Sequence, residues 1–161
     1  MNVRLLMLAV AAAALIGSCA LIPRRDTVAY PAEGGPGPAP AGVFVDKVDV
    51  DRRVLSREVA RDIEALLPVL APGNGFAVSG GEGWPLRVHV VERETIRDFT
   101  PQYAIMVSIE MFSSVDAAQP ALTVVHTSES ADSISSPWIL KRILSDCLKE
   151  AARAFAAGRG K

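Results

Sequence analysis

Residues 86–112 read LRVHVVERETIRDFTPQYAIMVSIEMF, and they decide the fold. Apolar and polar side chains alternate from Leu86 to Ile96 and again from Tyr103 to Phe112, as they do in strands that bury only one face. The intervening Phe99-Thr100-Pro101 interrupts this pattern. A third alternating run, Ala121 to Glu129, follows after a polar break, so the sequence predicts an antiparallel meander of three long strands.

A strand and two helices flank the predicted meander. Residues 43–50 are rich in β-branched side chains and predict a strand. Residues 56–70 predict a helix, and Pro68 removes an amide donor, so this helix either kinks there or ends a turn before Pro72. The apolar stripe of this helix consists of Val59, Ile63, Leu66, Leu67 and Leu70. Residues 136–158 predict the last helix, with a serine N-cap followed by proline.

The order strand, helix, three strands, helix predicts a single α+β domain over residues 43–158. We expect a four-stranded antiparallel sheet with both helices on one face, because this two-layer packing buries every apolar stripe. The opposite face of the sheet is then left partly open to solvent.

The N-terminus has the anatomy of an export signal. Arg4 precedes an apolar run from Leu5 to Ile16 that, at ~1.5 Å per residue, is too short to cross ~30 Å of hydrocarbon, so a secretory signal is favoured over a membrane-spanning helix. The run ends Leu15-Ile16-Gly17-Ser18-Cys19, which resembles the lipobox of bacterial lipoprotein precursors. This resemblance implies a signal peptide over residues 1–18, cleavage before Cys19 and attachment of lipid to its thiol. The alternative is an ordinary signal peptide with a chance cysteine.

Residues 19–42 lack hydrophobic periodicity, and Ala32 to Ala41 is rich in proline and glycine. Such a composition cannot bury a core, so we interpret residues 19–42 as the lipidated cysteine followed by a tether. In a polyproline-like conformation this tether would reach roughly 60 Å. We therefore expect the domain to stand slightly off the membrane.

Charge and motif content argue against several classes of function. The net charge is −1, and it becomes −2 when Arg4 leaves with the signal peptide, so bulk electrostatics disfavour nucleic-acid binding. Cys147 falls on the last helix, where a buried apolar role is expected. His89 and His126 lie in predicted strands as sheet-surface imidazoles. With no catalytic, phosphate-binding or paired-cysteine motif in the sequence, we expect no enzymatic activity, metal or cofactor.

The open face of the sheet holds the candidate ligand contacts. Strand alternation places four potentially cationic side chains opposite to the core face, namely Arg87, His89, Arg93 and Arg97, with Met106 and Phe112 beside them. Guanidinium groups pair with phosphate and methionine adapts to acyl chains, so this face is a candidate contact for an anionic lipid or glycolipid. The alternative is a plain solvated face. Val91 interrupts the alternation of the strand, which indicates a bulge at this position. We assign Glu92, Glu94 and Asp98 to the solvated end of the hairpin.

The order of segments in this chain resembles that of the LPS-assembly lipoprotein (LptE-like) family. The segments are the lipobox, the Pro-rich tether, the strand Val43 to Val50, the helix Ser56 to Leu70, the hairpin Leu86 to Ile109 and the closing helix. The resemblance is one of element order over most of the mature chain. It implies an outer-membrane lipoprotein that binds a β-barrel translocon protein and contacts lipopolysaccharide. Auxiliary lipoproteins of ABC-type envelope lipid-transport systems have a similar order and are the alternative. Ala20 stands where many inner-membrane lipoproteins carry aspartate, so the enterobacterial sorting pattern favours the outer membrane, with the domain in the periplasm.

Overall fold

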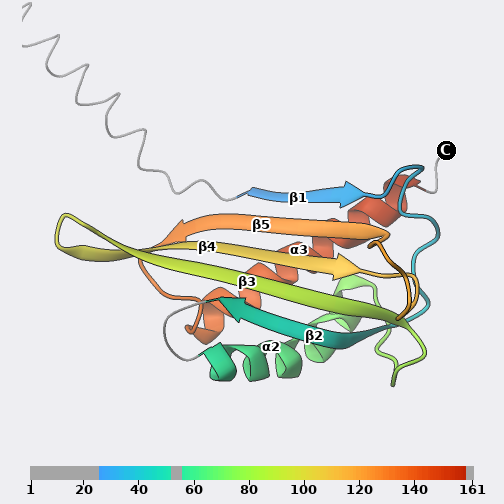
Figure 1. Ribbon diagram of the computed structural model, residues 1–161, viewed down its shortest axis with the longest axis horizontal. Helices are drawn as coiled ribbons and strands as arrows, with labels where there is room; N and C mark the ends of the chain where they lie inside the picture. Colours follow the sequence, from blue (N-terminus) through green and yellow to red (C-terminus); the bar gives the residue numbers. More distant parts are fainter. Residues whose placement is uncertain (1–25, 52–55, 159–161) are drawn as a thin grey trace, which may run out of the picture.

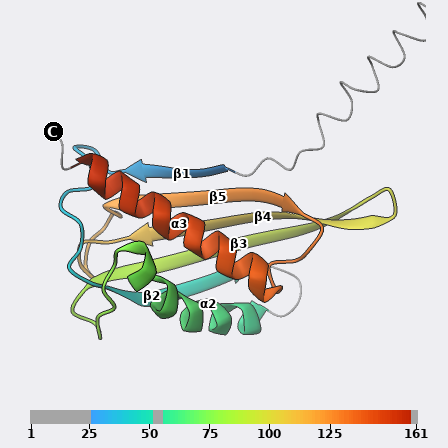
Figure 2. The same ribbon diagram turned by 180° about the vertical axis from the view of Figure 1, so that it is seen from behind.

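The computed structural model describes residues 26–51 and 56–158, so the predicted signal peptide and Cys19 lie outside the described residues. Within them, helices α2 and α3 cover one face of a five-stranded sheet (Figures 1 and 2), which confirms the predicted α+β class. The elements in chain order are β1 (Asp26–Pro31), β2 (Val43–Asp51), α2 (Ser56–Leu70), the 3-10 helix η1 (Pro72–Asn74), β3 (Trp84–Arg97), β4 (Thr100–Met111), β5 (Leu122–Ser130) and α3 (Pro137–Gly158).

The predicted hairpin forms the centre of the sheet. β3 and β4 pair antiparallel without a register shift, from Leu86 opposite Met111 to Arg97 opposite Thr100, so β3 has no bulge at Val91. β5 continues the meander on the far side of β4. Most side chains of β3 and β4 that face the helices are buried and apolar: Leu86, Val88, Val90, Ile105, Val107, Ile109 and Met111.

The prediction of a four-stranded, wholly antiparallel sheet was wrong. The strand order is β1-β5-β4-β3-β2, and β2 runs parallel to β3, with Val43 opposite Trp84. Helix α2 is the physical reason, because it carries the chain back to the end of the sheet where β2 began. β3 therefore starts beside the start of β2 and runs in the same direction, as strands joined by a helical crossover do.

The fifth strand, β1, lies within residues 19–42, for which the sequence predicts a tether. Residues Asp26 to Pro31 pair antiparallel with β5, from Asp26 opposite Thr127 to Pro31 opposite Leu122. The alternation of apolar and polar side chains is weak in this segment because an edge strand needs few apolar side chains. Pro31 lacks a backbone N–H, but it stands at the end of an edge strand, where no hydrogen bond to a neighbouring strand is lost. The chain that separates Cys19 from the sheet is consequently only residues 20–25.

The core lies between the sheet and the helices. Helix α3 crosses β1, β5 and β4 diagonally, and α2 packs along β2 (Figure 2). The proline at position 68 does not end α2, which continues to Leu70 before η1 begins. Cys147 on α3 is fully buried, which confirms the role expected for it.

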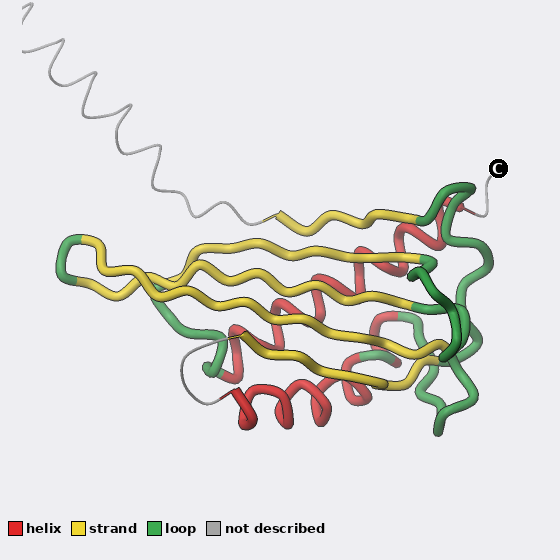
Figure 3. The backbone as a smooth tube through the Cα atoms, in the orientation of Figure 1, coloured by secondary structure: helices red, strands yellow, loops and turns green. Residues whose placement is uncertain are grey.

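The end of the β3–β4 hairpin extends beyond the rest of the sheet (Figure 3). β5 ends at Ser130, opposite Tyr103, so residues 95–102 form a two-stranded ribbon without a third strand. Among the helices of residues 26–51 and 56–158, none is long and apolar enough to cross a membrane.

Candidate functional site

The sheet face opposite the helices carries three of the four predicted contact residues. The neighbouring Leu86, Val88 and Val90 point into the core, so strand alternation turns Arg87, His89 and Arg93 to the open face. The predicted position of these three side chains, on the sheet face opposite the helices, is therefore confirmed. The structure adds the partners of each charged side chain, which come from β2 and β4 and which strand patterns alone did not identify.

Arg87 is held between a carboxylate and an aromatic ring. Its Nε donates to Oδ2 of Asp46 at 2.9 Å, and its guanidinium carbon lies 4.4 Å from the centroid of the Phe112 ring. Phe112 is itself buried, so the guanidinium covers an apolar ring that would otherwise meet water. Arg87 is thus fixed in place by packing and by charge.

Arg93 forms a second pair, with Asp51 at the end of β2. Its Nη2 donates to Asp51 Oδ2 at 2.6 Å, and its Nη1 donates to the backbone carbonyl of Asp51 at 3.3 Å. The hydrogen bond and the charge of Arg93 hold the pKa of the Asp51 carboxyl below its usual value, and Asp51 in turn raises the pKa of Arg93. Both groups are exposed, so the pair is a surface ion pair of modest strength.

His89 lies between two carboxylates. Its Nδ1 is 3.5 Å from Asp49 Oδ2, and its Nε2 is 3.6 Å from Glu110 Oε2. Lys47 also contacts Asp49 at 2.8 Å, and this hydrogen bond, with the charges of Lys47 and His89, lowers the pKa of Asp49. A protonated His89 would bridge β2 and β4 across β3.

These contacts bear on the predicted anionic ligand. Arg87 and Arg93 already have carboxylate partners on β2, so a phosphate group would have to compete with Asp46 and Asp51 for them. The apolar part of the face lies next to the charges, where Met106 pairs with Val91 and keeps 40% of its surface exposed. The face offers a mixed polar and apolar surface in which most charge is neutralised locally.

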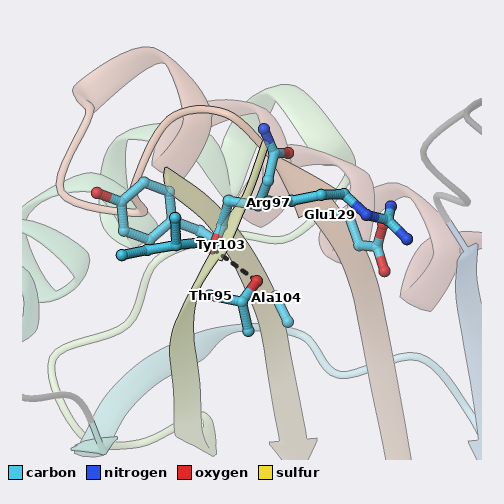
Figure 4. A pocket seen from close by; sticks show the side chains of 7 residues that line it. Thr95, Arg97, Tyr103, Ala104 and Glu129 are labelled. Atoms are coloured by element: carbon cyan, nitrogen blue, oxygen red, sulfur yellow. Dashed lines mark hydrogen bonds between the residues drawn. The ribbon is translucent and has the colours of Figure 1, made fainter. Parts of the chain in front are cut away.

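Arg97, the fourth predicted contact residue, lies away from the other three. It lines a hollow of about 260 Å³ at the base of the projecting ribbon, together with Thr95, Ile96, Gln102, Tyr103, Ala104 and Glu129. Figure 4 shows Arg97 beside Glu129, while Tyr103 extends in the other direction. The Thr95 hydroxyl donates to the carbonyl of Gln102 at 3.4 Å across the ribbon. The hollow is open and carries one charge of each sign.

Two polar side chains that the sequence predicts to be solvated are buried. Glu92, assigned to the solvated end of the hairpin, is 7% exposed and faces the core side. Its Oε2 accepts the backbone N–H of Ile134 at 2.6 Å and the Ser133 hydroxyl at 2.9 Å, so it fastens β3 to the loop before α3. His126, expected on the sheet surface, is 1% exposed, and its Nδ1 lies 2.8 Å from Thr27 Oγ1 of β1.

The chemistry that these residues can perform is limited to binding. Burial raises the pKa of the Cys147 thiol to about 12, with the nearby Asp146 charge adding to the effect, so this thiol is protonated and unreactive near neutral pH. Within residues 26–51 and 56–158, no three histidine, cysteine or acidic side chains come together as metal ligands.

Comparisons with known proteins give a fold likeness and no family. Neither a scan against protein-family models nor a search of curated proteins found a match. Two similar solved structures are PelC dodecamers from Paraburkholderia phytofirmans. A point variant of PelC aligns with a TM-score of 0.53 at 14% identity, covering 79% of this chain and 96% of that chain. A second PelC structure aligns with a TM-score of 0.52 at 10% identity, covering 80% and 96%.

Proposed function

We propose that this chain is a lipid-anchored, non-catalytic subunit of an outer-membrane assembly that transports lipopolysaccharide, with its domain in the periplasm. The observation that carries the proposal is the segment Leu15 to Cys19 at the end of an apolar run, which is the pattern of a lipidated N-terminus. The resemblance in element order to the LPS-assembly lipoprotein family supports this choice of machine. An accessory lipoprotein of an ABC-type lipid-transport system is the alternative.

The open sheet face supports a binding role for the domain. Its charged side chains hold one another through the pairs Arg87–Asp46 and Arg93–Asp51. Met106 adds exposed apolar surface beside them. A mixed face of this kind, with polar groups already positioned, suits contact with a protein partner such as an outer-membrane β-barrel.

The PelC dodecamers support an assembly that contains several copies of this chain. β1 and β2 are the edge strands of the described sheet, and sheet edges are surfaces through which chains associate. We expect light scattering of the detergent-solubilised protein, corrected for bound detergent, to give several times the mass of one mature chain. A monomer at all concentrations would contradict this part of the proposal.

Mass spectrometry of the protein purified from bacterial membranes tests the anchor. We expect a mature chain that begins at Cys19 and carries added diacylglycerol and acyl mass. The matched control is Cys19→Ala, which should leave the precursor uncleaved and without lipid. A mature wild-type chain without lipid mass would refute the proposal at its first step.

Crosslinking in intact cells distinguishes the two candidate machines. A photoreactive amino acid in place of Met106 reports on the open face, and one in place of Val69 on α2 serves as the control. We expect position 106 to capture a large β-barrel protein in outer-membrane fractions. Capture of an ATPase and permease complex would favour the ABC-type alternative.

A further inference from the structure

The tip of the β3–β4 hairpin exposes two large apolar side chains. Phe99 is fully exposed, and Ile96 is 77% exposed. They lie at the end of the two-stranded ribbon, beyond the strands that bury their neighbours. Neither side chain belongs to the hydrophobic core of the described domain, so most of their apolar surface meets water.

The backbone at the tip adopts a strained conformation. Asp98 and Phe99 form a two-residue turn with φ values of 51° and 60°. Such left-handed turns favour asparagine followed by glycine, and a bulky residue at the second position is disfavoured. Strain of this kind persists mainly where a side chain serves a function. The tip thus keeps an aromatic ring in water at a position where glycine would fit better.

The tip lies at the end of the molecule that faces the predicted anchor. Asp26 is level with Met106 across β5, and seven residues of strand separate Met106 from Phe99, which is about 24 Å at ~3.4 Å per residue. The seven steps from Asp26 back to Cys19 span at most about 25 Å. A lipid anchor at Cys19 and the ring of Phe99 can therefore lie in one plane.

We propose that Ile96 and Phe99 insert into the lipid surface that holds the anchor, so that the hairpin is a second membrane contact. This inference rests on the proposed function for the anchor itself. The charged residues nearest the tip, Arg97 and Asp98, balance one another, so the contact is apolar and does not require anionic lipid. Aromatic rings favour the boundary between head groups and acyl chains, and a second contact fixes the orientation of an anchored domain.

The test tethers the domain without its natural lipid. A chain that begins at Ala20 retains the whole described core, which comprises residues from Ala29 to Phe155. An N-terminal hexahistidine tag attaches it to vesicles of phosphatidylethanolamine and phosphatidylglycerol that contain a nickel-chelating lipid. A polarity-sensitive dye is coupled to Thr100→Cys near the tip, or to Glu82→Cys in the exposed loop at the opposite end. Because the Cys147 thiol is buried, the dye reacts only with the introduced cysteine.

We expect the dye at position 100 to shift its emission to the blue and to be quenched by nitroxide-labelled lipid, while the dye at position 82 stays water-like. Phe99→Gly should lower the ratio of docked to undocked protein about tenfold, the loss expected when one large side chain leaves the lipid. Val69→Ser removes an apolar side chain that is 73% exposed and lies far from the tip, and it should change nothing.

Equal emission at positions 100 and 82, or a Phe99→Gly variant that docks like Val69→Ser, would overturn the inference. Vesicles of pure phosphatidylcholine with the same nickel-chelating lipid should give the same docking, and docking only to anionic vesicles would refute the apolar contact. Because the tag replaces the natural anchor, failure here is distinct from failure of lipidation at Cys19, which mass spectrometry reports separately.

Discussion

Replacing Glu92 by alanine should lower the free energy of unfolding by about 2–4 kcal/mol. The carboxylate accepts a backbone N–H from Ile134 at 2.6 Å and the Ser133 hydroxyl at 2.9 Å. A hydrogen bond to a charged group contributes roughly 1.5–3 kcal/mol, and a buried donor left without its acceptor costs roughly 1–3 kcal/mol. Removal of the buried charge recovers part of this loss, because that charge no longer has to be desolvated.

Urea unfolding of the chain that begins at Ala20, followed by circular dichroism, measures this loss. Glu94→Ala is the matched control, because Glu94 lies two residues further along β3 and is exposed. Glu92→Gln keeps one acceptor oxygen and should lose less than Glu92→Ala. In a double-mutant cycle, Glu92→Ala and Ser133→Ala should be less than additive, because they remove the same bond. If Glu92→Ala costs no more than Glu94→Ala, the carboxylate does not fasten β3 to the loop before α3.

Three further outcomes follow from the structure. Phe99→Gly should raise the free energy of unfolding by about 1 kcal/mol in urea, since it relieves a left-handed backbone at a fully exposed residue, and a loss of stability would contradict the assigned turn. The pKa of Asp51 is lower in the folded protein than its ordinary value of 3.8, so the Asp51 carboxylate stabilises the fold above pH 3.8, and this stabilisation is lost as the pH falls through the folded pKa. The wild-type protein should therefore lose more stability than Asp51→Asn between about pH 5 and 2. Equal pH dependence would show that the pair with Arg93 does not form in solution. Cys147, with its pKa near 12, should react with a disulfide reagent at pH 8 only at the rate of unfolding, and rapid labelling of the native protein would refute its burial.

The parts of the fold that the sequence predicts are those fixed by local periodicity. The alternation in residues 86–112 specifies two strands and the face that each buries. The helices over residues 56–70 and 136–158 follow from apolar stripes and end signals within each segment. These patterns need no knowledge of what lies across the sheet, so they can be read from one chain.

The parts that sequence patterns missed depend on neighbours distant in the chain. The parallel pairing of β2 with β3 follows from the path of α2, and β1 is ordered by its pairing with β5. The partners of Arg87 and Arg93, Asp46 and Asp51, lie on a strand about 40 residues away, since the separations are 41 and 42. Glu92 is different, because the alternation of Val88 and Val90 already placed it on the core face, and its charge argued for solvent instead.

The position of β1 changes the geometry of the proposed anchor. A tether over residues 19–42 would let the domain move roughly 60 Å from the membrane in any orientation. With β1 in the sheet, residues 20–25 are the whole link, and the link leaves the sheet on the side of the hairpin tip. If lipid is attached at Cys19, the link joins the sheet at the end that carries the hairpin tip, and the loop at residues 32–42 and the segment at residues 72–83 lie at the opposite end of the domain. Under the proposed function, this far end of the domain would be the part open to a periplasmic partner.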